Sequence, residues 1–421
     1  MTTTAAAVEA VWRIESGRLV AALARRTGDF SAAEDLAQDA LEIALRQWPR
    51  DGIPEHPASW LMATAKHVAA DRYRRQTNLN RKLAVLAHQE SVKQSQERDP
   101  MATVDDHLDT AVHDDLLRLI FTACHPALST DSQVALTLRT LGGLQTKEIA
   151  RAFLTSEATM GQRISRAKRT LTEQRVRFEL PPADQLPTRL EAVLGVIYLV
   201  FNEGYSATAG DDWTRPALCQ DALRLGRVLV GLQPQQAEVH GLVALMELQS
   251  SRLPARTGPD GEPVLLADQD RRRWDQLLIA RGLAALDRAE GLGGGAFTLQ
   301  AAIAACHARA VSVEDTDWRR IAALYTVLAH LTPSSVVLLN RAVAVGMSEG
   351  AARGLEEADR LRDEATLAGY PQLPAVRGTF LQQLGRHDQA RAEFERAAAL
   401  TSNAGERRLY LQSAVEADRR Q

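Results

Sequence analysis

Basic side chains gather in one part of this sequence, between Arg139 and Arg177. Nine residues of that stretch are lysine or arginine and three are acidic, which leaves six net positive charges, whereas the whole chain carries −3. A local excess of cations of this size can hold the phosphate backbone of a nucleic acid. The charge pattern therefore indicates a nucleic-acid contact confined to a small part of the chain.

The segment from Glu157 to Leu171 separates its apolar and cationic side chains onto opposite sides of a predicted helix. Its apolar residues recur at spacings of four, three and four, which predicts a buried stripe. They are Met160, Ile164, Ala167 and Leu171. The polar side chains on or beside the opposite face are Gln162, Arg163, Ser165, Arg166, Lys168 and Arg169. Arginine can bond guanine edges or phosphates, and glutamine and serine can bond base edges. A solvated surface is the alternative for this helix taken alone.

A shorter helix predicted just before it favours the nucleic-acid interpretation. The predicted N-caps in this region are Asp131, Thr146 and Ser156. Gly142-Gly143 ends the first helix, Lys147 opens the second, and Leu154-Thr155 forms a tight turn before the third. Two helices joined by so short a turn are typical of a helix-turn-helix. DNA contact is thus favoured over a merely solvated face.

An acidic face is predicted earlier in the chain, in SAAEDLAQDALEIALRQW. Ser31 and Glu34 match a capping box. The expected buried stripe consists of Ala37, Leu41, Ala44 and Trp48. The opposite face carries Asp35, Gln38, Asp39 and Glu42. By itself this pattern indicates only a solvated face.

A further helix is predicted in ASWLMATAKHVAADRYRRQ, which has an apolar side and a basic end. Leu61, Ala65 and Val68 form the apolar side. The basic residues are Lys66, Arg72, Arg74 and Arg75. For Trp60, core packing is the favoured role over stacking on a base.

The elements that position these residues are predicted to be helices throughout. Alanine, leucine, arginine and glutamate dominate the 421 residues, and aromatic residues make up 5%. The fold class expected is all-α. Three well-separated cysteines favour a reducing compartment over disulfides or a zinc site, and neither a signal peptide nor a membrane span is recognisable, so a cytoplasmic location is expected. No metal site and no cofactor are expected.

Breaks in helical periodicity divide the chain into blocks. We predict a helical domain over 1–77, a linker of mixed helix and coil over 78–112, the helix-turn-helix domain over 113–180 and a helical C-terminal domain over 190–421. Pro181-Pro182 precedes the last block. Within it, Leu384–Leu400 resembles half of a tetratricopeptide repeat, with small residues at Ala390 and Ala397 around Phe394.

These motifs together resemble the extracytoplasmic-function sigma factors of the sigma-70 family. AEDLAQDALEIALRQW resembles region 2, and Asp131–Leu171 resembles region 4. One departure is Gly161, where many relatives carry a polar or charged side chain. Four further segments resemble a subgroup that fuses the sigma core to a tetratricopeptide-like extension: Leu194–Thr208, Leu265–Leu286, Leu299–Ala310 and Leu339–Val345.

The resemblance implies partners and roles. The partners are core RNA polymerase, through its β′ clamp helices and β flap, and promoter DNA; no membrane contact is expected. Polymerase binding would fall to Glu34, Asp35, Gln38, Asp39 and Glu42. The −10 element would meet Trp60, Lys66, Arg72, Arg74 and Arg75. The −35 element would meet Lys147, Gln162, Arg163, Ser165, Arg166, Lys168 and Arg169. The extension would regulate the sigma core by intramolecular contact.

Two other classes of function remain open at this point. A helix-turn-helix regulator with a helical sensor domain would bind a duplex operator without polymerase. An interaction scaffold with a vestigial helix-turn-helix would have no need of the cations on the last helix. An enzyme is not expected: Glu203, Tyr205, Asp211 and Asp212 lie close in sequence, but capping or packing explains them better than acid–base chemistry.

Overall fold

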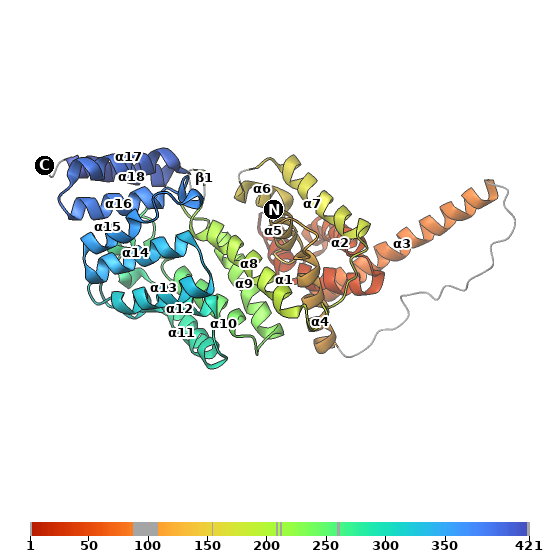
Figure 1. Cartoon of the computed structure of the whole chain (residues 1–421). Helices are drawn as coiled ribbons and strands as arrows, with labels where there is room; N and C mark the ends of the chain where they lie inside the picture. Colours follow the sequence, from red (N-terminus) through yellow and green to blue (C-terminus); the bar gives the residue numbers. More distant parts are fainter. Residues whose placement is uncertain are drawn as a thin grey trace. The chain divides into compact units, whose positions relative to one another are not determined.

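The structure is a computed structural model of the 421-residue chain. It describes residues 2–86, 108–153, 155–207, 209–210, 213–258 and 262–418. These residues form α-helices with short 3-10 segments and one pair of two-residue strands, so the all-α prediction is confirmed. The chain divides into two compact units, residues 1–196 and 197–421, with α8 (Leu186–Tyr205) running across the division (Figure 1).

Unit 1 is built around its first helix, α1 (Thr2–Thr27). This helix packs against α2 (Phe30–Asp51), α3 (Pro57–Leu86) and α4 (Leu108–Ala123), and it buries Trp12, Leu19 and Leu23. No proline or glycine interrupts the sequence after Pro57, and α3 therefore continues to Leu86 rather than ending near Arg75. Of the predicted linker 78–112, residues 78–86 belong to α3, 108–112 belong to α4, and 87–107 lie outside the described residues.

The start of α2 differs from the predicted capping box. Asp29 is the N-cap, and its carboxylate accepts hydrogen bonds from the backbone N–H groups of Ser31 and Ala32, at 2.8 and 3.2 Å. An aspartate at this position satisfies the first free amides without help from Ser31. The side chain of Glu34 is thereby left for other contacts, and it is buried.

The helix-turn-helix consists of α5 (Thr130–Thr140), α6 (Thr146–Ala152) and α7 (Glu157–Glu173). Ser156 caps α7 as predicted, and its hydroxyl accepts a hydrogen bond from the Thr159 N–H at 3.0 Å. The other two predicted caps are wrong by one or two residues, because Ser129 precedes α5 and Thr146 lies within α6. The predicted stripe of α7 is buried: Met160, Ile164, Ala167 and Leu171.

Close packing of α1 against the turn after α5 makes these helices part of one compact unit. Gly143 has a φ of +69°, and a Cβ there would lie 2.7 Å from the Ser16 hydroxyl and 3.0 Å from the Cα of Arg13. A side chain at position 143 would therefore be strained and would collide with α1.

In unit 2, successive helices pack on one another along the chain. They are α9 (Pro216–Leu232), α10 (Ala237–Ser250), α11 (Gln276–Gly291), α12 (Ala296–Arg309), α13 (Trp318–Leu331), α14 (Ser335–Glu349), α15 (Ala351–Asp359), α16 (Gln372–Gln383), α17 (His387–Leu400) and α18 (Ala404–Asp418). Four 3-10 turns interrupt them: η1 (Leu253–Ala255), η2 (Leu266–Asp268), η3 (Arg271–Arg273) and η4 (Ala365–Leu367).

The segment with the repeat pattern, Leu384–Leu400, contains α17, which packs against α16. Ala390, Phe394 and Ala397 are buried, and a Cβ at Gly378 would lie 2.9 Å from the Phe394 ring. Small residues thus let the two helices approach around one aromatic ring, as the sequence pattern indicated. Near the end of the chain, β2 (Ser402–Asn403) pairs in parallel with β1 (Ala209–Gly210) and joins the first and last parts of this unit.

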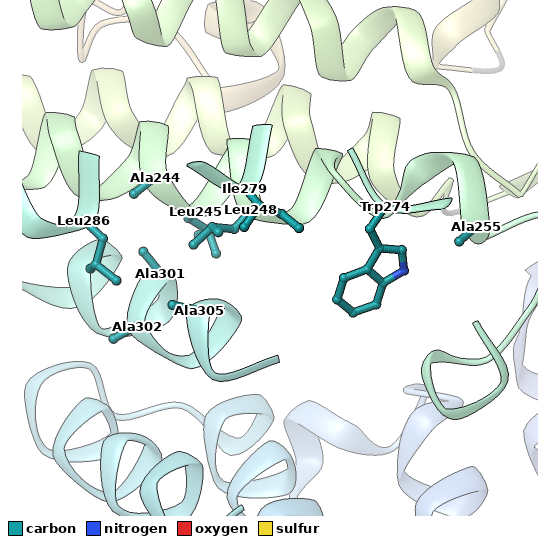
Figure 2. Packing of buried hydrophobic residues seen from close by; sticks show 10 residues of the cluster. All are labelled: Ala244, Leu245, Leu248, Ala255, Trp274, Ile279, Leu286, Ala301, Ala302 and Ala305. Atoms are coloured by element: carbon teal, nitrogen blue, oxygen red, sulfur yellow. The ribbon is translucent and has the colours of Figure 1, made fainter. Parts of the chain in front are cut away.

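One core of unit 2 lies among α10, α11 and α12. Figure 2 shows its packing, in which alanines of α12 face leucines of α10 and α11. Trp274, which follows η3, is the aromatic member of the ten side chains drawn and is 3% exposed. This ring borders a cluster of arginines that is described below.

Candidate nucleic-acid and polymerase interface

The residues predicted to contact DNA at the −35 element divide into two groups according to their exposure to solvent. Gln162, Ser165, Arg166 and Arg169 are exposed, as is Lys147 on α6. Arg169 has one partner on its own helix, Glu173, at 3.4 Å, and both side chains are largely exposed. An exposed pair of this kind contributes little stability, so Arg169 can exchange it for a phosphate or a base.

The second group, Arg163 and Lys168, is held within unit 1. Arg163 is half-buried and pairs with Asp131 of α5 at 3.4 Å. The Lys168 ammonium contacts the Glu34 carboxylate and lies 3.1 Å from a carboxylate oxygen of Asp35. These cations are therefore engaged by acidic side chains of the same unit.

Helix α7 also carries Gly161, the residue at which the sequence was expected to depart from the family pattern. A Cβ added at this position would meet only the Thr146 methyl group, at 3.9 Å. That distance is an ordinary van der Waals contact. Packing within the described residues therefore does not require a glycine here.

The Glu34 side chain connects α2 with the helix-turn-helix, two segments that lie far apart in the sequence. Its side chain is 2% exposed, and Arg139 of α5 donates to it through Nε at 3.1 Å while Lys168 of α7 contacts its other oxygen. Arg139 also donates to the Leu144 carbonyl at 3.3 Å, which fixes the guanidinium beside the turn. A buried carboxylate is tolerated only with such partners. While these pairs persist, Glu34 is not accessible to another protein.

The remaining residues of the predicted acidic face are more accessible. Asp35 has a side chain 54% exposed, Glu42 is exposed and pairs with Arg46 at 3.2 Å, and Gln38 and Asp39 are half-buried. This face of α2 therefore presents carboxylates at its surface next to the contact with α7.

Two further ion pairs connect α1 to the later helices, and the sequence patterns gave no sign of them. Arg13 pairs with Glu148 of α6 at 2.6 Å, and Arg25 pairs with Asp115 of α4 at 3.1 Å. Burial raises the pKa of Asp115, and the nearby guanidinium groups of Arg25 and Arg118 offset this only in part. A charge pattern along one helix cannot reveal partners that lie 90 or more residues away in the sequence.

Residues predicted to meet the −10 element lie on α3. Trp60 is half-buried and packs edge-on against Trp48, with ring centroids 5.3 Å apart. Lys66 is half-buried and Arg74 is exposed. Arg72 and Arg75 belong to the same helix, but their side chains lie outside the described residues.

In unit 2, the segment considered for acid–base chemistry makes polar packing contacts instead. The Glu203 carboxylate is paired with Arg215, and the Tyr205 hydroxyl accepts a hydrogen bond from Arg252 Nε at 3.1 Å. Asp211 and Asp212 lie outside the described residues. Among the described residues, no group of three or more His, Cys, Asp or Glu side chains is arranged to hold a metal ion. None of the described helices combines the length and apolar character needed to cross a membrane.

Comparison with known families agrees with the geometry of unit 1. The family "Sigma-70 region 2" matches residues 13–78, and the family "Sigma-70, region 4" matches residues 118–171. A third, "Family of unknown function (DUF6596)", matches residues 189–290. The first match contains α2 and most of α3, and the second contains α5, α6 and all but the last two residues of α7.

Two relatives extend the comparison. The uncharacterized protein R00370 of Rhizobium meliloti (strain 1021) is 44% identical over 387 residues, which is 91% of this chain and 90% of that protein. The probable ECF RNA polymerase sigma factor SigI of Mycobacterium tuberculosis is 27% identical over 177 residues, which is 42% of this chain and 58% of that protein. The similarity to R00370 thus includes most of unit 2 as well as unit 1.

Proposed function

We propose that this chain, in which residues 13–78 and 118–171 match sigma-70 regions 2 and 4, binds core RNA polymerase through the acidic face of α2 and directs initiation at promoters whose −35 element is read by α7. The observation that carries the proposal is the presence, in one compact unit, of an exposed acidic face on α2 and an exposed cationic face on the helix of a helix-turn-helix. In this proposal the acidic face binds polymerase and the cationic face binds promoter DNA.

For the −35 element, the support is the accessibility of the side chains. Arg166 and Arg169 are exposed and can reach guanine edges or phosphates, and Gln162 and Ser165 can bond base edges. Lys147 on α6 can add a phosphate contact. Arg163 and Lys168 would take part only after leaving their present acidic partners.

We further propose that the isolated protein holds its two sigma regions together through Glu34. The support is chemical: Lys168 is a candidate DNA contact, Glu34 and Asp35 are candidate polymerase contacts, and here they neutralise one another. Docking of polymerase on α2 would replace this contact and release α7 for DNA.

Regulation by unit 2 is the last part of the proposal. Its support is the covalent fusion of a helical unit with its own buried core to the two sigma regions. An intramolecular influence of unit 2 on promoter output would follow from any contact that it makes with unit 1 or with polymerase during initiation.

Transcription in vitro with core polymerase and a library of promoter sequences tests the proposal. We expect initiation from a subset of promoters only when this protein is added. Charge reversal of two residues, Asp35→Arg with Asp39→Arg, should abolish co-purification with core polymerase, whereas reversal of the exposed Asp287 on α11 should not. Undiminished binding by the double variant would refute the assignment of the α2 face.

The same transcription assay distinguishes a sigma factor from a stand-alone helix-turn-helix regulator. A helix-turn-helix regulator would bind a duplex operator tightly without polymerase and would not initiate transcription by itself. Specific duplex binding without core enzyme, together with no transcription in its presence, would favour that alternative.

A further inference from the structure

Three arginines of unit 2 lie around one seam of aromatic rings. Arg252 follows α10, Arg256 follows η1, and Arg271 opens η3. The ζ carbon of Arg256 lies 3.8 Å from the centre of the Tyr205 ring, and that of Arg252 lies 5.7 Å from the same ring. Arg252 and Arg271 both approach Trp274, at 5.8 and 4.7 Å from its ring. The three cations therefore form one contiguous cluster.

The cluster has cations but lacks a neutralising acid. Within the part of the chain that the structure describes, none of the three arginines forms an ion pair. Burial lowers the pKa of Arg256, and repulsion from Arg252 lowers it further. Arg271 experiences the same two effects, offset in part by the exposed Glu314 and Asp315. Uncompensated cations this close together are unfavourable unless a counter-charge arrives.

Fixed contacts hold the guanidinium groups in place, and they leave Nε of Arg256 and Nε of Arg271 without a hydrogen-bond partner among the described residues. Arg256 donates to the Tyr205 carbonyl at 3.0 Å, and Arg271 donates to the carbonyls of His307 and Ala310 at 2.6 and 2.8 Å. Arg256 is also covered by the ring of Trp213, 5.2 Å away. With two rings against this guanidinium, its unpartnered Nε is the donor left for a further bond.

Several buried donors on this seam have no hydrogen-bond partner. They are Nε of Arg256, Nε of Arg271 and the indole N–H groups of Trp213 and Trp274. Arg256 is 8% exposed and Trp274 is 3% exposed, so water does not freely solvate them. Leaving a buried donor unsatisfied is unfavourable, and more so for a charged group. Four such donors from three segments of the chain indicate that an acceptor-rich group is missing.

We propose that unit 2 binds a small oxyanion-bearing molecule, through a carboxylate or phosphate group, on the edges of Arg252 and Arg256 beside Trp213 and Trp274. Arginine edges are suited to planar, bidentate recognition of such groups, and the aromatic rings provide an apolar wall for the rest of the molecule. Arg252 and Arg271 are only half-buried, so the seam reaches solvent.

Binding is tested with the full-length protein and two probes, sodium benzoate and inorganic phosphate. Each is titrated at constant ionic strength against sodium chloride, with Tm and tryptophan fluorescence as readouts. We expect a saturable response to at least one probe, and the stronger responder identifies the anion as carboxylate or phosphate. Trp213→Phe and Trp274→Phe should each diminish the fluorescence change. No saturable response beyond that of chloride would overturn the proposal.

Arginine variants separate a binding role from a structural one. Arg256→Met removes a buried, unneutralised charge, so the Tm of the unliganded protein should stay equal or rise while affinity for the probe falls at least tenfold. Arg252→Gln, at a half-buried position, should weaken binding to a similar extent and provides the test if Arg256→Met does not fold. The control Arg281→Gln, on the exposed face of α11, should bind normally. Undiminished binding by both site variants would contradict the proposal. The assay contains neither polymerase nor DNA, so its outcome does not depend on the sigma role.

Discussion

At the scale of single residues, Glu34 is the most consequential side chain of unit 1. It is buried, and its two oxygens are bound by cations from two later helices, Arg139 of α5 and Lys168 of α7. Removing one partner from a buried ion pair leaves an incompletely neutralised charge, which costs more than the pair itself contributes. Glu34 therefore couples the stability of the sigma core to the position of the recognition helix.

A double-mutant cycle measures this coupling. Lys168→Met should lower the free energy of unfolding by about 1–3 kcal/mol, since Arg139 still neutralises Glu34 in part. Combining it with Glu34→Gln should restore some of the loss, because the buried charge is then gone. Urea denaturation of the four proteins gives the result. Arg169→Met, on the exposed side of the same helix, is the matched control and should change stability by less than about 0.5 kcal/mol. Strictly additive effects would show that residues 34 and 168 are not coupled.

His307 should make unit 2 sensitive to acid. Burial, together with repulsion from the neighbouring Arg252 and Arg271, lowers the pKa of His307 to about 3. The unfolded chain takes up this proton near pH 6.5, whereas the folded protein does not until near pH 3. Stability from this group is thus fully present above pH 6.5 and is lost as pH falls through that interval.

The expected loss between pH 6.5 and 5 is about 2 kcal/mol. His307→Phe keeps a ring against Trp318 and should flatten the pH dependence of unfolding. Urea midpoints at pH 7 and pH 5 provide the measurement. His330→Phe, at an exposed position on α13, should retain the wild-type slope. Equal slopes for wild type and His307→Phe would contradict the assignment.

At the scale of elements, α7 has two faces that should respond differently to substitution. Arg166→Ala and Arg169→Ala should each weaken promoter binding by the holoenzyme by about 1–3 kcal/mol per specific contact, with Tm nearly unchanged. Lys168→Ala should lower Tm, because its partner Glu34 is buried. Binding of promoter DNA and thermal melts of the same variants separate the two effects. If Arg166→Ala and Arg169→Ala lower Tm without weakening promoter binding, the two faces of α7 have been assigned the wrong roles.

At the scale of the whole molecule, the question is what unit 2 contributes to transcription. A chain that stops after Tyr205 retains both sigma regions and all of α8. If unit 2 biases the sigma core with the 1–3 kcal/mol typical of coupled sites, promoter output should change by about fivefold or more. Output is measured by transcription in vitro at equal concentrations of holoenzyme. An unchanged output would remove the regulatory part of the proposed function.

The sequence by itself determined the helical fold class, the apolar stripe of α7 and the cap at Ser156. All of these depend on neighbours within a few turns of one helix, and local periodicity and capping rules are sufficient to find them. The two sigma regions were located by the resemblance of their motifs to a family. The C-terminal end of α3 was not predicted correctly. The polar composition after Arg75 indicated a linker, but no helix breaker follows and the helix continues to Leu86.

Only the tertiary structure decided which charged residues face solvent and which face one another. The sequence pattern placed Glu34 in a capping box and the family resemblance assigned it to polymerase, while Lys168 was assigned to DNA, yet the two residues form a pair across 134 positions of the chain. The same holds for Arg252, Arg256 and Arg271, which are unremarkable in sequence and gather around aromatic rings only after folding. Ion pairing and burial depend on distances in space, and these are set by how whole helices pack rather than by the pattern along any one of them.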